Sequence, residues 1–288
     1  MNKGEKQITG VSRKNFLRGM AAAGAGLMMP NFGPWGASAL AAQERQAGGI
    51  LAIGLYLDPP NFDPISNTSG TILATMGPCY NGLVVYNPAN QDEIIGDLAE
   101  SWEFSRDGKV LSFKLISGVK FHDGKPMTSA DVKASFDLMR DPPADMVSPR
   151  APALAMIASI DAPDDTTVHF NLNRPAPSLL NILAGGWMLV MPKHILDEKG
   201  NMKDQVVGTG PFRMTSVQQG VSIELERNPE YHVPGRPLLD GIKFFIIPDQ
   251  GTALSYLTTG QLNLLPSLTG QAKGAAISPD IKVLEGLG

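Results

Sequence analysis

Residues 118–140 read GVKFHDGKPMTSADVKASFDLMR and concentrate charged side chains in a short span. If residues 118–121 end a strand, His122 and Asp123 point to opposite faces, because successive side chains alternate across a strand. The two groups then do not act on one substrate atom. The Asp123–Gly124 pair predicts a turn, since glycine tolerates the positive φ that tight turns require.

The second half of this stretch has the pattern of a capped amphipathic helix. Thr128 is followed three residues later by Asp131, a spacing typical of a helix start. Apolar residues at helical spacing then predict one buried face, formed by Val132, Phe136 and Met139. The aspartates do not share a helix face, so we interpret the charges as a cap and a solvent face. The stretch is predicted to be scaffold.

The composition is that of a soluble globular chain long enough for two domains, with 288 residues, 43% of them hydrophobic and 18% charged. Lysine and arginine total 24 against 28 acidic residues, and the sequence has no basic run interleaved with aromatic residues. Nucleic acid is therefore not an expected partner. The single cysteine, Cys79, excludes an internal disulfide and is interpreted as a small buried hydrophobic residue.

Residues 1–41 have the features of a secretory leader. Basic residues precede an apolar stretch of small residues that closes on Ala39-Leu40-Ala41, the small-x-small pattern that signal peptidase accepts. We therefore expect the export machinery to cleave the chain near Ala41. The string SRKNFLRG resembles the twin-arginine motif with Lys14 in place of the second arginine, so Sec and twin-arginine export both stay open. A membrane-spanning helix is the alternative, which the glycines and prolines of the stretch disfavour.

From Gly48 onward, strand-like and helix-like segments alternate, which predicts a mixed α/β fold. Two strands surround Asp107-Gly108 and predict a β-hairpin. The other predicted strands are 48–57, the end of 71–86, 164–173, 220–228, 240–248 and a strand beginning at 262–266. The other predicted helices are the start of 71–86, a short helix in 176–184 from Ser178, and 249–261, ending at Gly260.

Several strings resemble the extracytoplasmic solute-binding proteins of peptide and nickel ABC transporters, and they occur in that family's order. They are FDP, DLAESWEFSRDGK, FKLISGVKFHDGKPMTSADVKASF, NRPAPS, MPKHIL, GTGPF, RNPEYH, GRPLLDGIKFFIIPD and ALSYLTTGQLNLL. The resemblance implies a periplasmic protein with two lobes that close over a ligand, plus a small α+β domain inserted into the first lobe. The opening stretch belongs to that inserted domain in the family.

On this pattern lobe one comprises residues 48–86 and 174–266, the inserted domain residues 87–173, and the start of lobe two residues 267–288. Relatives are typically nearly twice as long, so we expect the second lobe to be largely missing from this chain. A chain truncated in this way is expected to bind solutes with affinity weaker than about 1 mM.

The sequence has no G-x-S-x-G, H-E-x-x-H, Walker-type or EF-hand motif, and no enzyme activity, cofactor or metal ion is expected. GTGPFR lacks the third glycine of a dinucleotide-binding loop. The histidines lie far apart in different predicted elements and are interpreted as structural: His122, His169, His194 and His232. Two acidic pairs, Asp164–Asp165 and Glu224–Glu226, are interpreted as solvated, and Met188 and Met191 as core residues.

Two segments are candidate ligand-binding sites. The loop Ser66-Asn67-Thr68-Ser69-Gly70 follows the first strand at its carboxyl end, where open α/β folds place ligands, and its polar groups suit a peptide. An ordinary surface loop explains this segment equally well. The second segment is Gly208-Thr209-Gly210, whose glycines allow close backbone approach and which the resemblance places on the lobe-one wall of the cleft. Tight turn geometry alone also explains its glycines.

Three functions follow as hypotheses. The resemblance implies a receptor that binds an oligopeptide or similar small solute and delivers it to the permease subunits of an ABC transporter. The alternative is a truncated fragment of such a receptor that binds nothing. An exported hydrolase is the third, which the absence of nucleophile motifs in the sequence disfavours.

Overall fold

The computed structural model describes residues 47–266. The predicted leader (1–41) and the predicted start of lobe two (267–288) lie outside the described residues. The first of two four-stranded sheets has the strand order β1-β10-β9-β8. Its strands are β1 (Ile50–Leu55), β10 (Gly241–Ile246), β9 (Ser222–Arg227) and β8 (Phe212–Gln218). β1 pairs with β10 in parallel, and the other pairs are antiparallel.

The second four-stranded sheet is antiparallel throughout and has the order β4-β5-β7-β6. Its strands are β4 (Ala99–Phe104), β5 (Val110–Leu115), β7 (Thr167–Leu172) and β6 (Ile157–Asp164). A separate hairpin contains β2 (Val84–Asn87) and β3 (Asn90–Gly96). The hairpin predicted around Asp107-Gly108 is confirmed as β4–β5, and Gly108 has a φ of 67°. Its inward-facing side chains, Leu111, Phe113 and Leu115, are buried as the alternation requires.

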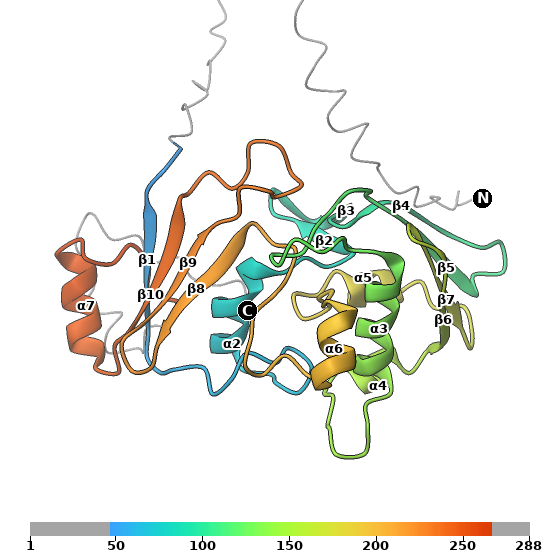
Figure 1. Cartoon of the computed structure of the whole chain (residues 1–288), viewed down its shortest axis with the longest axis horizontal. Helices are drawn as coiled ribbons and strands as arrows, with labels where there is room; N and C mark the ends of the chain where they lie inside the picture. Colours follow the sequence, from blue (N-terminus) through green and yellow to red (C-terminus); the bar gives the residue numbers. More distant parts are fainter. Residues whose placement is uncertain (1–46, 267–288) are drawn as a thin grey trace, which may run out of the picture.

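Several helices lie between the two four-stranded sheets, and one lies outside them. In Figure 1, α7 lies on one side of the first sheet, while α2, α6 and α3 lie on the side that faces the second sheet. The helices are α2 (Gly70–Met76), the 3₁₀ turn η1 (Gly77–Cys79), α3 (Ser129–Arg140), α4 (Ala151–Leu154), α5 (Leu179–Leu183), α6 (Lys193–Lys199) and α7 (Gln250–Thr258). None of the helices in residues 47–266 has the length and apolar character needed to span a membrane.

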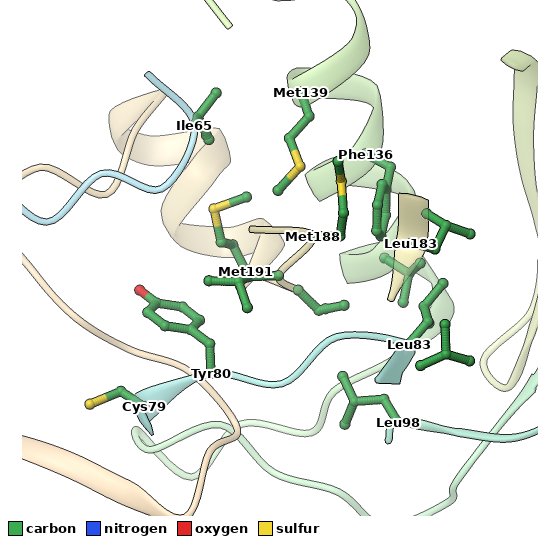
Figure 2. Packing of buried hydrophobic residues seen from close by; sticks show 14 of the residues in the cluster. Ile65, Cys79, Tyr80, Leu83, Leu98, Phe136, Met139, Leu183, Met188 and Met191 are labelled. Atoms are coloured by element: carbon green, nitrogen blue, oxygen red, sulfur yellow. The ribbon is translucent and has the colours of Figure 1, made fainter. Parts of the chain in front are cut away.

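One continuous apolar core joins these elements. Figure 2 shows Met191 near Tyr80, and Phe136 of α3 close to Met188 and Leu183. Met188 and Met191 are 7% and 0% exposed, which confirms that they are core residues. Cys79 is fully buried, also as predicted, and burial raises its pKa to about 12.

The opening stretch differs from the prediction in one respect. Residues 118–121 do not end a strand, because only an isolated bridge joins Lys120 to Pro126. His122 and Asp123 instead lie in the turn, where Gly124 has the predicted positive φ of 86°. The two side chains still diverge: His122 contacts the backbone of Gly208 and Gly210, and Asp123 accepts a hydrogen bond from His194 at 2.8 Å.

The capped helix is confirmed as α3. Thr128 donates to the Asp131 carboxylate both from its backbone N–H, at 2.8 Å, and from its hydroxyl, at 3.0 Å. Val132, Phe136 and Met139 are fully buried. Asp131 is buried too, and its other carboxylate oxygen accepts a hydrogen bond from the Lys193 N–H at the start of α6, which offsets the loss of hydration. The cap therefore joins two helices.

Elsewhere the predictions were less complete. The predicted helix 249–261 ends at Thr258, and the predicted strand from 262 is an isolated parallel bridge between Ile53 and Leu264. The sequence did not predict the strands β3, β6 and β8 or the helices α4 and α6. The second four-stranded sheet lies entirely within residues 87–173, but the boundary at residues 86 and 87 falls within β2 of the β2–β3 hairpin. The division into lobe one and inserted domain stays a prediction.

Candidate ligand-binding site

The carboxyl ends of β1 and β10 lie at the same edge of the first sheet, because these strands pair in parallel from Ile50–Gly241 to Leu55–Ile246. The chain that leaves each strand leads to a helix, α2 after β1 and α7 after β10. A cavity of about 340 Å³ opens at this edge. It is lined by Gly54, Leu55, Tyr56, Gly70, Thr71, Ala74, Ile247, Gln250, Ala253, Leu265 and Pro266. Open α/β folds bind ligands at such positions.

One wall of the cavity is a segment that crosses the edge of β1. The N–H of Gly54 donates to the Leu264 carbonyl at 3.0 Å, and the N–H of Asn263 donates to the Ala52 carbonyl at 2.8 Å. A Cβ at position 54 would lie 2.5 Å from Cδ2 of Leu265, so a larger residue there would require the leucine side chains to shift.

Polar groups enter the cavity from both helices and from the end of β1. Gly70 and Thr71 form the first turn of α2, where backbone N–H groups have no intrahelical acceptor. Tyr56 follows β1 directly and keeps 57% of its surface exposed, and Gln250 begins α7. These groups provide an aromatic face, a side-chain amide and backbone donors. Such a set suits a small polar ligand with an extended backbone.

Asp249, just before α7, is committed to the helix rather than to a ligand. Its carboxylate accepts both the N–H and the hydroxyl of Thr252 at 2.7 Å, which is an N-terminal cap. The Thr252 hydroxyl, followed by the Thr252 N–H, lowers the pKa of Asp249, so this side chain is ionised at neutral pH.

The predicted loop Ser66–Gly70 leads into this cavity, but only its last residue lines it. Ser66 and Asn67 use their side chains inside the loop: Ser66 donates to Asp63 Oδ2, and Asn67 donates to Asn61 Oδ1 at 2.8 Å. Thr68 is exposed and Ser69 is half-buried in front of α2. Their contact with a ligand stays a prediction.

The other predicted segment, Gly208-Thr209-Gly210, lies in the interior and does not line the cavity. A Cβ at Gly208 would lie 2.1 Å from the Cys79 carbonyl oxygen, and one at Gly210 would lie 2.4 Å from the Cys79 carbonyl carbon. The close approach that its glycines allow is therefore an approach to the protein's own backbone. Thr209 is 1% exposed and donates to Asn81 Oδ1 at 3.0 Å. Contact of the Gly208-Thr209-Gly210 segment with a ligand stays a prediction, and packing against Cys79 and Asn81 explains why glycine and threonine occur there.

The four histidines lie in separate places, and the His232 ring packs against the ring of Tyr231. His169 is bonded to Ser112 at 2.8 Å, while His122 and His194 have the partners given above. Within residues 47–266, no group of three or more His, Cys, Asp or Glu side chains could hold a metal ion.

Among the polar residues of the cavity, sequence reasoning missed Tyr56, Thr71 and Gln250. Thr71 begins a predicted helix, Tyr56 lies near the end of the predicted strand 48–57, and Gln250 follows the predicted strand 240–248. These positions are the available signal. The signal becomes specific only when β1 and β10 are known to be parallel neighbours, because parallel strands bring their carboxyl ends to one edge.

Comparisons with known proteins agree with this fold. The profile of the bacterial extracellular solute-binding proteins, family 5 Middle, matches residues 93–286. One relative, from Brucella ovis, carries the name of an ABC transporter peptide-binding protein. It is 33% identical over 257 residues, and the match covers 85% of this chain and 47% of the Brucella protein. The chain spans about half the length of the curated relatives it matches.

Two solved structures are similar over the same region. AgaA from A. tumefaciens R10, in complex with agropinic acid, is 30% identical with a TM-score of 0.69, covering 75% of this chain and 43% of AgaA. DppA from Helicobacter pylori, in complex with the peptide STSA, is 29% identical with a TM-score of 0.72, covering 80% of this chain and 49% of DppA.

Proposed function

The chain belongs to the bacterial extracellular solute-binding proteins of family 5, and on this premise we propose that it binds a peptide or a similar small solute outside the cytoplasm. In this role it delivers the solute to the permease subunits of an ABC transporter. The observation that carries the proposal is the cavity at the shared carboxyl ends of β1 and β10. The names of its relatives support this class of function, since they describe solute-binding proteins rather than enzymes.

Different residues of the cavity bind different parts of the ligand. The first-turn N–H groups of Gly70 and Thr71 donate hydrogen bonds to the ligand's carbonyl oxygens, and the Gln250 side chain pairs with its amides. Tyr56 covers an apolar part of the ligand with its ring. The cavity of about 340 Å³ is near the small end of ligand pockets, so it holds part of a peptide at a time.

The proposal extends to domain organisation and export. Residues 48–86 and 174–266 form the lobe that carries the cavity, residues 87–173 form the inserted domain, and a second lobe covers the ligand from the other side. Export uses the leader at 1–41, with cleavage near Ala41. N-terminal sequencing of periplasmic material tests the leader: a chain that begins near Ala42 supports it, and a chain that retains Met1 contradicts it.

A cavity-filling variant tests the binding site. Gly70 is exposed, and a Cβ added there meets no atom within 4 Å, so Gly70→Leu introduces a side chain at the cavity without straining the fold. Thermal stabilisation is measured with di- and tripeptides and opines at up to about 10 mM, because a ligand that binds only the native state raises the midpoint. We expect saturable stabilisation of the wild type and at least about a tenfold weaker affinity for Gly70→Leu.

Ala130→Leu is the matched control. Ala130 is exposed at the start of α3, on an element that does not border the cavity. It should bind like the wild type. Equal affinity for the wild type and Gly70→Leu would show that the ligand lies elsewhere, and no stabilisation by any solute would contradict the receptor function.

A further inference from the structure

Arg150 is a buried arginine at the start of α4. Its side chain and backbone together keep 5% of their surface exposed. The backbone is fixed on both sides: its N–H donates to the Ser148 hydroxyl at 3.3 Å, and its carbonyl accepts the N–H groups of Ala153 and Leu154 at 3.0 and 3.1 Å. The guanidinium therefore has a defined place in the fold rather than a free position at the surface.

The guanidinium is held by an aromatic ring but lacks a charged partner. Its Cζ lies 4.2 Å from the centroid of the Trp187 ring, a stacked cation–π contact. Its Nη1 is buried and has no hydrogen-bond partner, and within residues 47–266 no ion pair reaches it. Arginine is rarely buried without a partner, because each unpaired donor loses its hydration.

The carboxylate of Asp63 interacts electrostatically with Arg150, but its oxygen atoms already accept hydrogen bonds from other groups. Burial is the main effect on the Arg150 pKa and lowers it, while Asp63 acts in the opposite direction. The Asp63 carboxylate accepts the N–H groups of Ile65, Ser66 and Met202, and the Ser66 hydroxyl as well. Its oxygen atoms are committed to the turn that begins the Ser66–Gly70 loop. The guanidinium thus keeps unsatisfied donors beside that loop.

A cavity near Arg150 in the chain has more basic than acidic side chains in its lining. Ser66 lines this second cavity, of about 210 Å³, together with Val147, three residues before Arg150. Its charged lining residues are Lys199, Lys203 and Asp145, and Arg150 lies outside the lining. From Ser66 to Gly70 the chain spans at most about 14 Å, so the second cavity and the main cavity are joined by one short loop. A solute that lies along this loop can reach both.

We propose that Arg150, stacked on Trp187, binds a carboxylate of the solute in the planar two-hydrogen-bond arrangement that guanidinium groups form. This deepens the proposed function and rests on it: the preferred solutes carry a free carboxylate, such as the C-terminus of a short peptide. The negative charge of the solute pairs with the Arg150 guanidinium, which Asp63 does not do because its oxygen atoms bind other groups.

Two measurements test the proposal. The first follows the Arg150 Nε–H resonance, identified by its absence in Arg150→Gln, during titration of the wild type with acetate, acetamide and phosphate. Acetate should shift the resonance saturably, and acetamide should not. The second compares Ala-Leu with its C-terminal amide. The wild type should prefer the acid by at least about tenfold, and Arg150→Gln should lose this preference.

Arg227→Gln is the matched control, since Arg227 is exposed and already paired with Asp240 at 3.3 Å. It should keep the wild-type preference for the acid. Arg150→Lys provides a second variant if Arg150→Gln fails to fold: it retains the charge without the planar fork, and its preference for the acid should fall at least threefold, which is roughly 0.65 kcal/mol.

The outcomes separate the two claims. If Ala-Leu and its amide bind the wild type equally and acetate leaves the Arg150 resonance unchanged, the carboxylate site is wrong and the receptor function stands. If acetate shifts the resonance but no solute stabilises the protein, the carboxylate site stands and the receptor function fails. Binding of phosphate in preference to acetate at Arg150 would overturn the assignment to a carboxylate.

Discussion

The His122 imidazole donates from Nε2 to the Gly210 carbonyl at 3.1 Å, while its Nδ1 accepts the N–H of Gly208 at 3.4 Å. One ring thus joins the turn of residues 122–124 to the loop that precedes β8. The arrangement requires the neutral Nε2–H tautomer, because a proton on Nδ1 would face the Gly208 N–H. Burial, as the largest effect, lowers the pKa of His122, and the charge of Arg213 lowers it further, against the hydrogen bond to Gly210.

This contact predicts that the protein loses stability in mild acid. The folded-state pKa of His122 lies below the ordinary value of 6.5, so the unfolded state binds the proton more readily. The contribution is fully present above pH 6.5 and is lost as pH falls below it, with a slope of at most about 1.4 kcal/mol per pH unit. Urea midpoints between about pH 7.5 and 5 should fall in the wild type and less in His122→Gln. Equal slopes in both proteins would show that another group is responsible.

The close packing of Gly210 predicts a large loss of stability in Gly210→Ala. The added Cβ would lie 2.6 Å from both the Pro78 carbonyl oxygen and the Tyr80 nitrogen, and backbone atoms cannot move aside cheaply. We expect a loss of about 3 kcal/mol or more by urea denaturation. The control is Gly251→Ala in α7, where the nearest atom is 3.4 Å away and alanine favours the helix. A small loss in Gly210→Ala would mean that the loop can separate from Cys79.

Both oxygen atoms of the Asp131 carboxylate accept hydrogen bonds from backbone N–H groups. We therefore expect Asp131→Ala to lower the free energy of unfolding more than Thr128→Ala does. Thr128→Ala removes a cap hydroxyl and should cost about 1 kcal/mol. Asp131→Ala leaves the N–H groups of Thr128 and Lys193 without their acceptor and should cost about 2–4 kcal/mol. Asp141→Ala, exposed beyond the end of α3, should stay within about 0.5 kcal/mol of the wild type. The reverse order for the first two variants would remove Asp131 as the link between α3 and α6.

The buried thiol predicts that the folded protein resists thiol reagents. Cys79 is fully buried, and burial raises its pKa to about 12, so the thiolate is scarce at about pH 8. Ellman's reagent should label the native protein only at the rate of unfolding, and should label one thiol per chain in guanidinium chloride. Rapid labelling of the native protein would show that the region around η1 opens without global unfolding.

Much of the fold was predictable because its signals are local. The cap at Thr128, the turns at Gly108 and Gly124, and the alternation of β5 each depend on a few neighbouring residues. The strands that were missed have weaker local signals. In β6 the register shifts twice against β7, which breaks the alternation of exposed and buried side chains.

The candidate site was predictable only in part. The Ser66–Gly70 loop was chosen because it follows the first strand, and Gly70 does line the cavity. The glycines of Gly208-Thr209-Gly210 were interpreted as a possible approach to a ligand, but they pack against Cys79. A glycine pattern indicates that something approaches the backbone closely, and only the fold decides whether it is a ligand or another part of the chain.

The sequence by itself determined many of the helices, turns and strands, because caps, turn residues and hydrophobic periodicity act over short separations. The class of protein came from the strings that resemble the solute-binding family. Only the tertiary structure decided where the polar groups meet. Asp240 hydrogen-bonds to Gly49 across 191 residues, at the start of the parallel β1–β10 pair that creates the cavity. In the same way, Arg150 meets Trp187 without any sequence signal, because such contacts depend on chain topology rather than on the residues that flank them.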